Sequence, residues 1–493
     1  MSAFSGAIPA GGDRVRYLAS KRLYIIVFPT VLLCAASLAG AFQTETVFGI
    51  ASAIVSLIGA YAFGDLLFGR SVLGCAKVIA VGFALGYGLT SCNTWLNVRH
   101  QPGGLSAFVG LDQAALCGGI AAVAVSCASL FALGDFLEPA IPIGVVSLAT
   151  TQQAKWFVIT GFAAVMYAFL RGDLTYMGQT HNSEGRITIL GTFAVWLIPP
   201  LFGITVAVVL VAKDRLQRLL FWALVFAEAV LTIPLGRRVF VYTLFIGGFV
   251  ARFCPILRKG ILWKRILVVG LGLAGMYVAS IAFLYLRFAA YELDPQTQHT
   301  LRAQVSEAYH VSQTKDYAEV AAALRENTVE RGFILGFLAD LIDQSAHHRT
   351  GDGQDLFNQA IVEIPAAIWK GKSAHLPISE EDLANLLFGT NFPDQANSIM
   401  TTGAVDFGIV GALVYPFIVV VLMAAFLGAM RTFATPLVAM VSLLSGVYLM
   451  LNTELDFSAY LAFFRNGLLF AGFVYLVGRF RPAWRGTAAQ SAL

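Results

Sequence analysis

Long runs of apolar residues dominate the chain, and one polar block of roughly 110 residues, from Tyr291 to Thr402, interrupts them. About 20 apolar residues in a helix cross the ~30 Å hydrocarbon core of a bilayer, so each apolar run predicts a membrane-spanning helix. The predicted fold is all-α: a polytopic membrane protein of about 12 transmembrane helices with one long helical loop.

The predicted segments follow one another in a simple order. They are an N-terminal tail (1–22), nine spans (23–287), the long loop (288–403), three spans (404–478) and a basic C-terminal tail (479–493). The individual spans are predicted at 23–42, 47–68, 72–92, 112–133, 155–170, 188–212, 216–234, 239–257, 266–287, 404–430, 435–452 and 457–478.

The long loop carries its own helical patterns. Residues 300–326 predict a solvated helix, and Ser379 with Asp382 forms a capping-box pattern that starts another. The stretch Gly332–Ile342 is apolar but too short to cross a bilayer. We expect it on the membrane surface or packed under the loop.

Composition narrows the class further. With 58% hydrophobic and 13% charged residues, the chain is too apolar for a soluble domain, and a net charge of +4 gives no sign of nucleic-acid binding. The six cysteines predict neither a disulfide framework nor, with the histidines, a metal site. Gly270, Gly272 and Gly275 match a dinucleotide-binding pattern but lie inside an apolar run, where close helix packing explains them.

The distribution of positive charge predicts the orientation. Lys and Arg concentrate on one side of the predicted spans, which the positive-inside rule assigns to the cytoplasm. Both termini are then cytoplasmic, and the long loop lies outside together with all seven histidines.

Several arginines lie on the outer side against this trend. Arg237 and Arg238 form a tight outer turn, where two guanidinium groups could grip a phosphate or pyrophosphate; alternatively they reach lipid headgroups or pair with Glu228. Arg465 falls ~11 Å below the outer surface, a depth at which an ionisable residue suggests function. A salt bridge between Arg465 and Glu228 is the structural alternative.

Candidates for proton transfer also lie on the outer side. A carboxylate beside lipid can have a raised pKa and act as a base near neutrality, and histidines titrate in the same range. The candidates are Glu454, Asp456, Asp340, Asp343, His347 and His348.

The chain resembles the bacterial O-antigen and exopolysaccharide repeat-unit polymerases. Many spans, a long loop before the last few helices and outward arginines are shared across the whole chain. Two segments carry the closer similarity: Ile364-Pro365-Ala366-Ala367-Ile368-Trp369-Lys370-Gly371-Lys372, and Asn397-Ser398 followed by Asp406-Phe407-Gly408-Ile409-Val410-Gly411. Ser373 stands where a proline is common in the family.

The resemblance implies a metal-independent, cofactor-free glycosyltransferase in the bacterial inner membrane. It would polymerise undecaprenyl-pyrophosphate-linked oligosaccharides at the periplasmic face, with membrane lipids and a chain-length regulator as further candidate partners. Cations must hold the leaving pyrophosphate and one base must serve the acceptor hydroxyl. We assign Arg237, Arg238 and Arg465 to the pyrophosphate with Arg287 and Arg331 as helpers, and the base to Glu454, Asp456, His347 or His348.

Two other functions fit the same pattern. An O-antigen ligase, which moves finished glycan onto the lipid A core, shares this architecture. A flippase or transporter of lipid-linked glycans belongs to a different class, and it should show inverted repeats and broken helices.

Overall fold

The structure, a computed structural model, describes residues 44–68, 74–137, 145–171, 174, 189–253, 274–275, 277–289, 301–322, 334–364, 368–369, 379–392 and 395–480. Every regular element within these ranges is helical, which confirms the all-α prediction. The labelled helices are α2 (Glu45–Phe68), α3 (Cys75–Phe83), the π-helix η1 (Ala84–Leu89), α4 (Thr90–Val98), α5 (Gly104–Val109), α6 (Gln113–Leu137), α7 (Val145–Ala149), α8 (Gln152–Arg171), α9 (Ile189–Val211), α10 (Arg215–Thr232), α11 (Arg237–Ala251), α14 (Leu301–Thr314), α16 (Leu335–His347), α17 (Gln354–Glu363), α18 (Glu380–Phe388), α19 (Ile399–Phe433), α20 (Pro436–Leu451) and α21 (Phe457–Phe480).

Seven helices in the described part of the chain are long and apolar enough to cross a membrane. They are Glu45–Gly64, Cys75–Val98, Gln113–Ala132, Gln152–Arg171, Phe193–Val211, Ile399–Phe433 and Phe457–Val477. Three further predicted spans contain shorter apolar helices, Val239–Ala251, Tyr277–Ala289 and Pro436–Leu451. The first predicted span, 23–42, lies outside the described residues. The chain is therefore consistent with a polytopic membrane protein, and 12 crossings stay a prediction.

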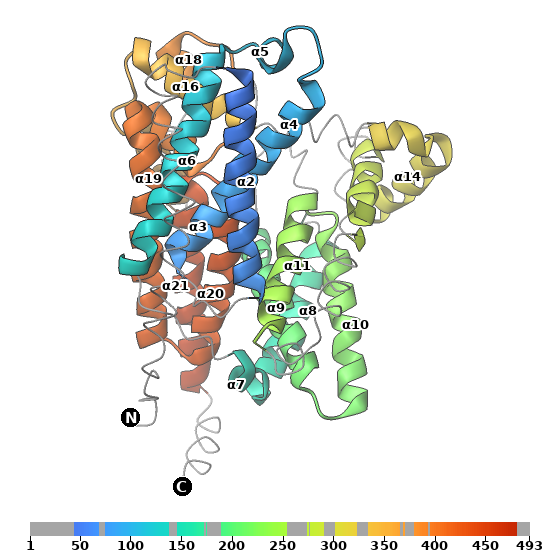
Figure 1. Ribbon diagram of the computed structural model, residues 1–493. Helices are drawn as coiled ribbons and strands as arrows, with labels where there is room; N and C mark the ends of the chain where they lie inside the picture. Colours follow the sequence, from blue (N-terminus) through green and yellow to red (C-terminus); the bar gives the residue numbers. More distant parts are fainter. Residues whose placement is uncertain are drawn as a thin grey trace.

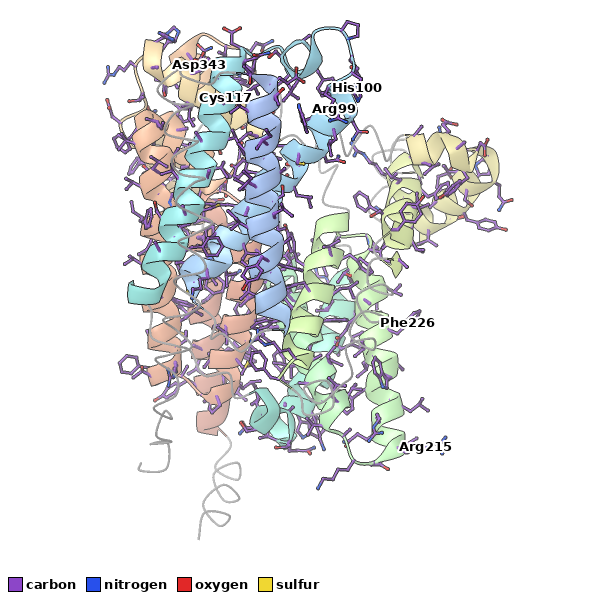
Figure 2. The ribbon with its side chains drawn as sticks, viewed as in Figure 1. Arg99, His100, Cys117, Arg215, Phe226 and Asp343 are labelled. Atoms are coloured by element: carbon purple, nitrogen blue, oxygen red, sulfur yellow. The ribbon has the colours of Figure 1, made fainter. Side chains whose placement is uncertain are left out.

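The helix α10 has an apolar face that is exposed along its length. Leu219, Trp222, Phe226 and Val230 follow one another at helical spacing, and all four side chains are exposed. Arg215 opens this helix at one end of the molecule, with Phe226 further along the same face (Figure 2). This outward apolar face suits contact with lipid.

The helices form two neighbouring groups (Figure 1). One group contains α2, α3, α6 and α19 to α21, and the other contains α8 to α11. The helix α9 joins them, because it contacts α8, α10, α11 and also α20. A hydrogen bond of 3.1 Å from Ser445 Oγ to the Trp196 carbonyl links α20 directly to α9.

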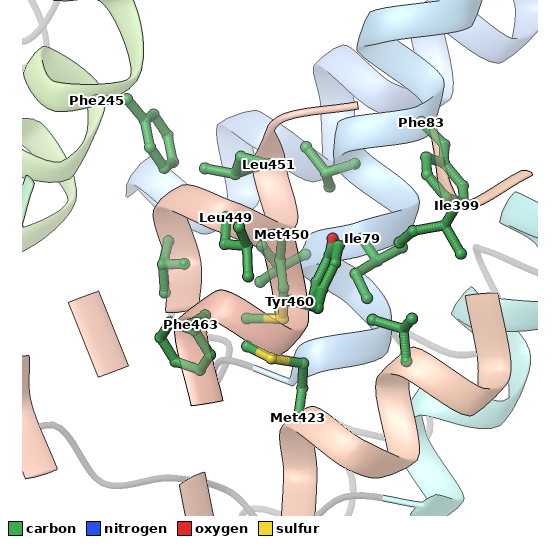
Figure 3. Packing of buried hydrophobic residues seen from close by; sticks show 14 of the residues in the cluster. Ile79, Phe83, Phe245, Ile399, Met423, Leu449, Met450, Leu451, Tyr460 and Phe463 are labelled. Carbon is green, nitrogen blue, oxygen red and sulfur yellow. The ribbon is translucent and has the colours of Figure 1, made fainter. Parts of the chain in front are cut away.

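The centre of the first group is an apolar core. Ile79 and Phe83 of α3 lie beside Met450 at the end of α20, Tyr460 and Phe463 of α21, and Met423 of α19 (Figure 3). All of these side chains are buried. Helices that meet inside a bilayer depend on such close packing, because lipid gives no hydrophobic force between them.

Two helices of the polar block, α16 and α18, lie at one end of the bundle, whereas α14 lies to one side of it (Figure 1). The helix α5 is at the same end as α16 and α18, and Figure 2 places Arg99, His100 and Asp343 at this end and Arg215 at the other. The apolar stretch near residues 332–342 forms α16, whose Leu335 and Leu338 are fully buried against α6 and α19. This stretch is therefore packed against other helices, and its position relative to the membrane stays a prediction.

Candidate functional site

A break in α19 organises the polar end of the bundle. Phe407 (φ −142°, ψ 22°) and Gly408 (φ 59°, ψ −146°) interrupt the helix, and the second conformation is one that essentially only glycine adopts. The first segment then folds back on the second, because Gly403 and Gly411 touch backbone to backbone. The sequence Asp406-Phe407-Gly408-Ile409-Val410-Gly411 thus encodes a break and a close helix contact.

Asp406, the last residue before the break, caps a helix from elsewhere in the chain. Its carboxylate accepts from the backbone N–H groups of Asp355 (2.8 Å) and Leu356 (3.1 Å) in the first turn of α17 and from the Tyr415 hydroxyl (2.8 Å). The N-cap residue of α17 is Gly353, which has no side chain to do this. A negative charge at a helix N-terminus is stabilising, so Asp406 fixes α17 against the break.

One face of α17 carries a polar stripe, which we call the α17 stripe: Asp355, Gln359 and Glu363, each four residues after the last. Both ends of the Gln359 amide are used. Its Nε2 donates to Asp355 Oδ2 (2.9 Å) and to Thr402 Oγ1 (3.0 Å), and its Oε1 accepts from the Ser458 backbone N–H (3.0 Å). The middle of the stripe therefore joins α17 to α19 and to the first turn of α21.

The α17 stripe meets a second buried acid, Glu380, at the start of α18. Its Oε2 accepts from the Thr402 hydroxyl at 2.9 Å. Burial raises the pKa of Asp355 to about 7, with the Asp406 charge adding to the effect and a hydrogen bond with Glu380 opposing it. Burial, together with the Asp355 charge, raises the pKa of Glu380 well above its usual range.

The raised pKa values of Asp355 and Glu380, the acid pair, favour one shared proton near neutral pH. Asp355 Oδ1 and Glu380 Oε1 are both buried, and neither has another hydrogen-bond partner in the described structure. A proton on Glu380 that is donated to Asp355 satisfies both oxygens. The pair thus joins α17 to α18 only while one carboxyl remains protonated.

Stability should fall as the pair ionises. The folded-state pKa of Asp355 lies above its unfolded value of 3.8, so its contribution is present below pH 4 and is lost as pH rises through about 7. We expect the loss of stability in the wild type to be on the order of 2 kcal/mol. The substitution Asp355→Asn should make this loss smaller. The test is the melting temperature of detergent-purified protein from pH 4 to 8. Equal pH dependence in wild type and variant would contradict it.

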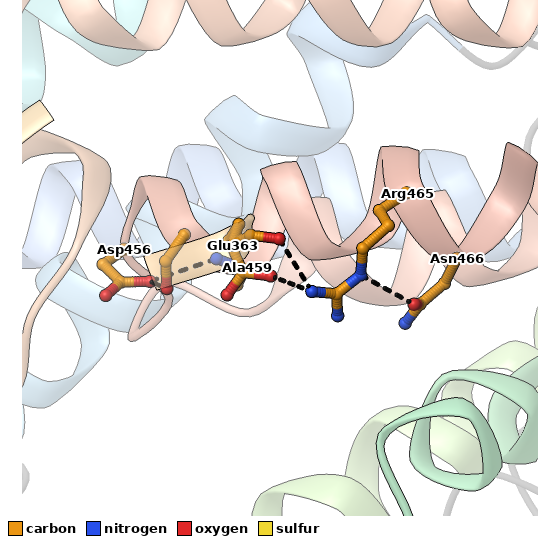
Figure 4. Close-up of polar contacts among 6 residues, drawn as sticks. Glu363, Asp456, Ala459, Arg465 and Asn466 are labelled. Atoms are coloured by element: carbon orange, nitrogen blue, oxygen red, sulfur yellow. Dashed lines mark hydrogen bonds and ion pairs between the residues drawn. The ribbon is translucent and has the colours of Figure 1, made fainter. Parts of the chain in front are cut away.

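At the far end of the α17 stripe, Glu363 pairs with Arg465 of α21 (Figure 4). Arg465 Nη1 lies 2.8 Å from Glu363 Oε2 and donates to the Glu363 backbone carbonyl at 3.0 Å. Its Nε reaches Asn466 Oδ1 at 3.4 Å. The Arg465 side chain is 28% exposed, and its Nη2 makes no bond within the described part of the chain.

Arg465 thus lies in a polar site, but with a partner other than the one the sequence suggested. The alternative of a salt bridge between Arg465 and Glu228 is wrong. Glu228 is buried in α10 and accepts from the Thr205 hydroxyl of α9 at 2.9 Å. Arg465 is therefore free of that structural pairing and faces the end of α17 instead.

The candidate bases divide into two places. Asp456 lies beside the α17 stripe, where its carboxylate accepts from Ser458 Oγ (2.6 Å) and the Ala459 backbone N–H (3.2 Å) and so caps α21. Glu454 is partly buried two residues earlier. His347 and His348 end α16 and are exposed, with the His348 ring 6.2 Å from that of Phe388.

The connector that bears Glu454 is held by α3 and η1. Thr453 Oγ1 donates to the Gly82 carbonyl at 2.7 Å, and a side chain at Gly86 would overlap Thr453. One residue on, Tyr87 in η1 shares a 2.5 Å hydrogen bond with Ser398 Oγ, the N-cap of α19. The π-helix thus brings α3 to the same polar end.

The remaining predicted cations are less fully placed. Arg237 and Arg238 begin α11, as the predicted turn requires, but their side chains lie outside the described part of the structure. Arg287 is partly buried in the helix Tyr277–Ala289, and Arg331 lies outside the described residues. Their roles stay predictions.

The acid pair, Gln359 and Glu363 are site residues that sequence reasoning missed. The four-residue spacing of the α17 stripe was a usable signal. Glu380 directly follows the capping residue Ser379, and no pattern in the sequence indicated its role. Within the described residues, no group of three or more His, Cys, Asp or Glu side chains is placed to hold a metal ion, and metal independence stays a prediction.

Comparison with known proteins adds no assignment. No protein-family model, curated protein or solved structure matches the chain.

Proposed function

We propose that this protein is a membrane glycosyltransferase that polymerises undecaprenyl-pyrophosphate-linked oligosaccharide units at the periplasmic face. The growing glycan would leave its lipid pyrophosphate and join the acceptor hydroxyl of an incoming lipid-linked unit. Arg465 would contact the leaving pyrophosphate, and the polar end of the bundle would receive the sugars.

One observation carries the proposal: Arg465 heads an apolar face that points outward. Leu468, Leu469, Phe473 and Leu476, the α21 apolar stripe, follow Arg465 at three, four, eight and eleven residues, and all four are exposed. Arg465 lies eight residues into α21, ~12 Å along the axis. A partly exposed cation above an exposed apolar face suits a substrate with an anionic headgroup and a long lipid tail.

The proposal also agrees with the distribution of polar groups. The α17 stripe, the acid pair and Asp456 lie around one end of α21. The helix α10, which carries Phe226 and Arg215, extends toward the opposite end of the molecule (Figure 2). A polar end of this kind can bind sugar hydroxyls while the tail stays in lipid. Arg237 and Arg238, at the start of α11, are the further candidates for the pyrophosphate.

The test is the purified protein in proteoliposomes with an undecaprenyl-pyrophosphate-linked repeat unit. We expect a ladder of lengthened glycans on gels, with release of undecaprenyl pyrophosphate. Absence of a ladder while unextended substrate persists would contradict the proposal. Transfer only to added lipid A core would indicate the ligase instead.

The break in α19 favours a second candidate, a transporter of lipid-linked glycans. Transporters use broken helices at their substrate sites, and the acid pair could carry a proton. The same proteoliposomes separate the two functions. For this test the lipid-linked glycan carries a fluorescent headgroup. A transporter moves the headgroup across the bilayer and so protects it from an impermeant quencher, without lengthening the glycan.

A further inference from the structure

Glu363 is positioned differently from the other acids at the polar end. Asp355 and Glu380 are buried, and the Asp406 carboxylate already accepts three hydrogen bonds. Asp456 caps α21 through two more. Glu363, by contrast, is 17% exposed and contacts Arg465, one of the arginines that we assign to the pyrophosphate.

The position of Glu363 also makes the charge of Arg465 important to it. Glu363 is the last residue of α17, where the helix dipole places partial negative charge, and no basic residue lies in that last turn. A carboxylate at this end is unfavourable unless a cation offsets it. Arg465 supplies that cation, from a residue 102 positions further along the chain.

The guanidinium group of Arg465 can contact both the Glu363 carboxylate and a pyrophosphate only if the two anions share it or bind it one after the other. A single nitrogen, Nη1, makes both contacts to Glu363, which leaves Nη2 for a phosphate oxygen. A pyrophosphate with its larger charge draws the guanidinium toward itself, because bidentate contact with phosphate is the stronger geometry. Glu363 then shares the Arg465 charge with the pyrophosphate, and its carboxylate becomes a stronger proton acceptor.

We propose that Glu363 is the general base of the glycosyl transfer, activated when the donor's pyrophosphate engages Arg465. This inference rests on the proposed function. The acceptor hydroxyl transfers its proton to the Glu363 carboxylate while its oxygen forms a bond to the anomeric carbon. The bond from that carbon to the pyrophosphate oxygen breaks, and the electron pair leaves with undecaprenyl pyrophosphate beside Arg465.

In this arrangement the donor must bind before Glu363 becomes active as a base. Without donor, Glu363 is held by Arg465 and is a weak base, so water in the site is not activated. With donor bound, the base and the leaving-group cation lie side by side on α17 and α21.

The test compares Glu363→Gln and Glu363→Asp with wild type in the polymerisation assay. Glu363→Gln should lower kcat about 100-fold or more, because general bases contribute 10²- to 10⁴-fold, and leave the donor KM within about threefold. The acidic limb of the pH–rate profile should disappear in Glu363→Gln and persist in Glu363→Asp. Formate should restore part of the activity of Glu363→Ala.

A matched control is Asp352→Asn, which removes an acid of an exposed ion pair with Arg349 at the same end of the bundle. Exposed pairs contribute little, so this variant should keep wild-type activity and melting temperature. A Glu363→Gln variant with a wild-type pH profile and near-wild-type kcat would overturn the inference while leaving the function intact. Lack of polymer from the wild type would overturn both.

Discussion

Arg465→Ala should lower the rate of glycan polymerisation by about 100- to 1,000-fold, the effect typical of removing one preorganised group that stabilises developing charge. Nη2 of Arg465 has no partner in the described structure, so the substrate would lose a charge-assisted contact that nothing else at this point replaces. Arg465→Lys should also be impaired, because a lysine cannot make a planar two-point contact with phosphate. The measurement is the initial rate of undecaprenyl pyrophosphate release.

The control for this prediction is the double variant Arg465→Ala with Glu363→Gln. Removing Arg465 alone takes its positive charge away from a carboxylate at a helix C-terminus, which destabilises the protein for a structural reason. The double variant removes both charges and should restore the melting temperature. If it also restores polymerisation, Arg465 serves only as the partner of Glu363, and its assignment to the pyrophosphate is wrong.

The sequence predicted those features that depend on neighbouring residues. Long apolar runs predicted the seven helices of the described chain that are long and apolar enough to cross a membrane. The pattern Ser379 with Asp382 correctly started α18, where Ser379 Oγ accepts from the Asp382 N–H at 3.1 Å. Both signals act within one or two helical turns, so a single sequence contains them in full.

The partners in the site could not be predicted in this way. Glu363 and Arg465 are far apart in the sequence, and their contact depends on the hydrogen bonds by which Asp406 and Gln359 fix α17 against α19 and α21. The acid pair depends in addition on Thr402 and Gln359. Isolated carboxylates in a polar loop look solvated, and only the tertiary structure shows that Asp355 and Glu380 are buried.

The break in α19 could be predicted from the sequence only in part. Phe407 and Gly408 suggest a turn, but they follow and precede apolar residues that read as a continuous span. The predicted span at 404–430 therefore contains the break, and helix α19 already begins at Ile399. The pattern of apolar residues does not show the contact between Gly403 and Gly411, which determines how closely the two segments of α19 pack.

Gly411→Ala should have the largest structural effect of the substitutions considered. A Cβ at this position would lie 2.7 Å from the carbonyl carbon of Gly403 and closer still to its oxygen, so the two segments of α19 must separate. Overpacking of this kind costs about 1–3 kcal/mol, and we expect the upper end because backbone cannot move aside as a side chain can. The measurement is the melting temperature in detergent.

Gly428→Ala is the matched control, since it lies in the same helix and a Cβ there meets nothing within 4 Å. Alanine has the higher helix propensity, so this variant should be neutral or stabilised by up to ~1 kcal/mol. Separation of the α19 segments should also displace Asp406 from the first turn of α17, and with it Glu363 from Arg465. Gly411→Ala should therefore lose polymerisation together with stability. Equal melting temperatures for the two variants would show that the break does not hold the site.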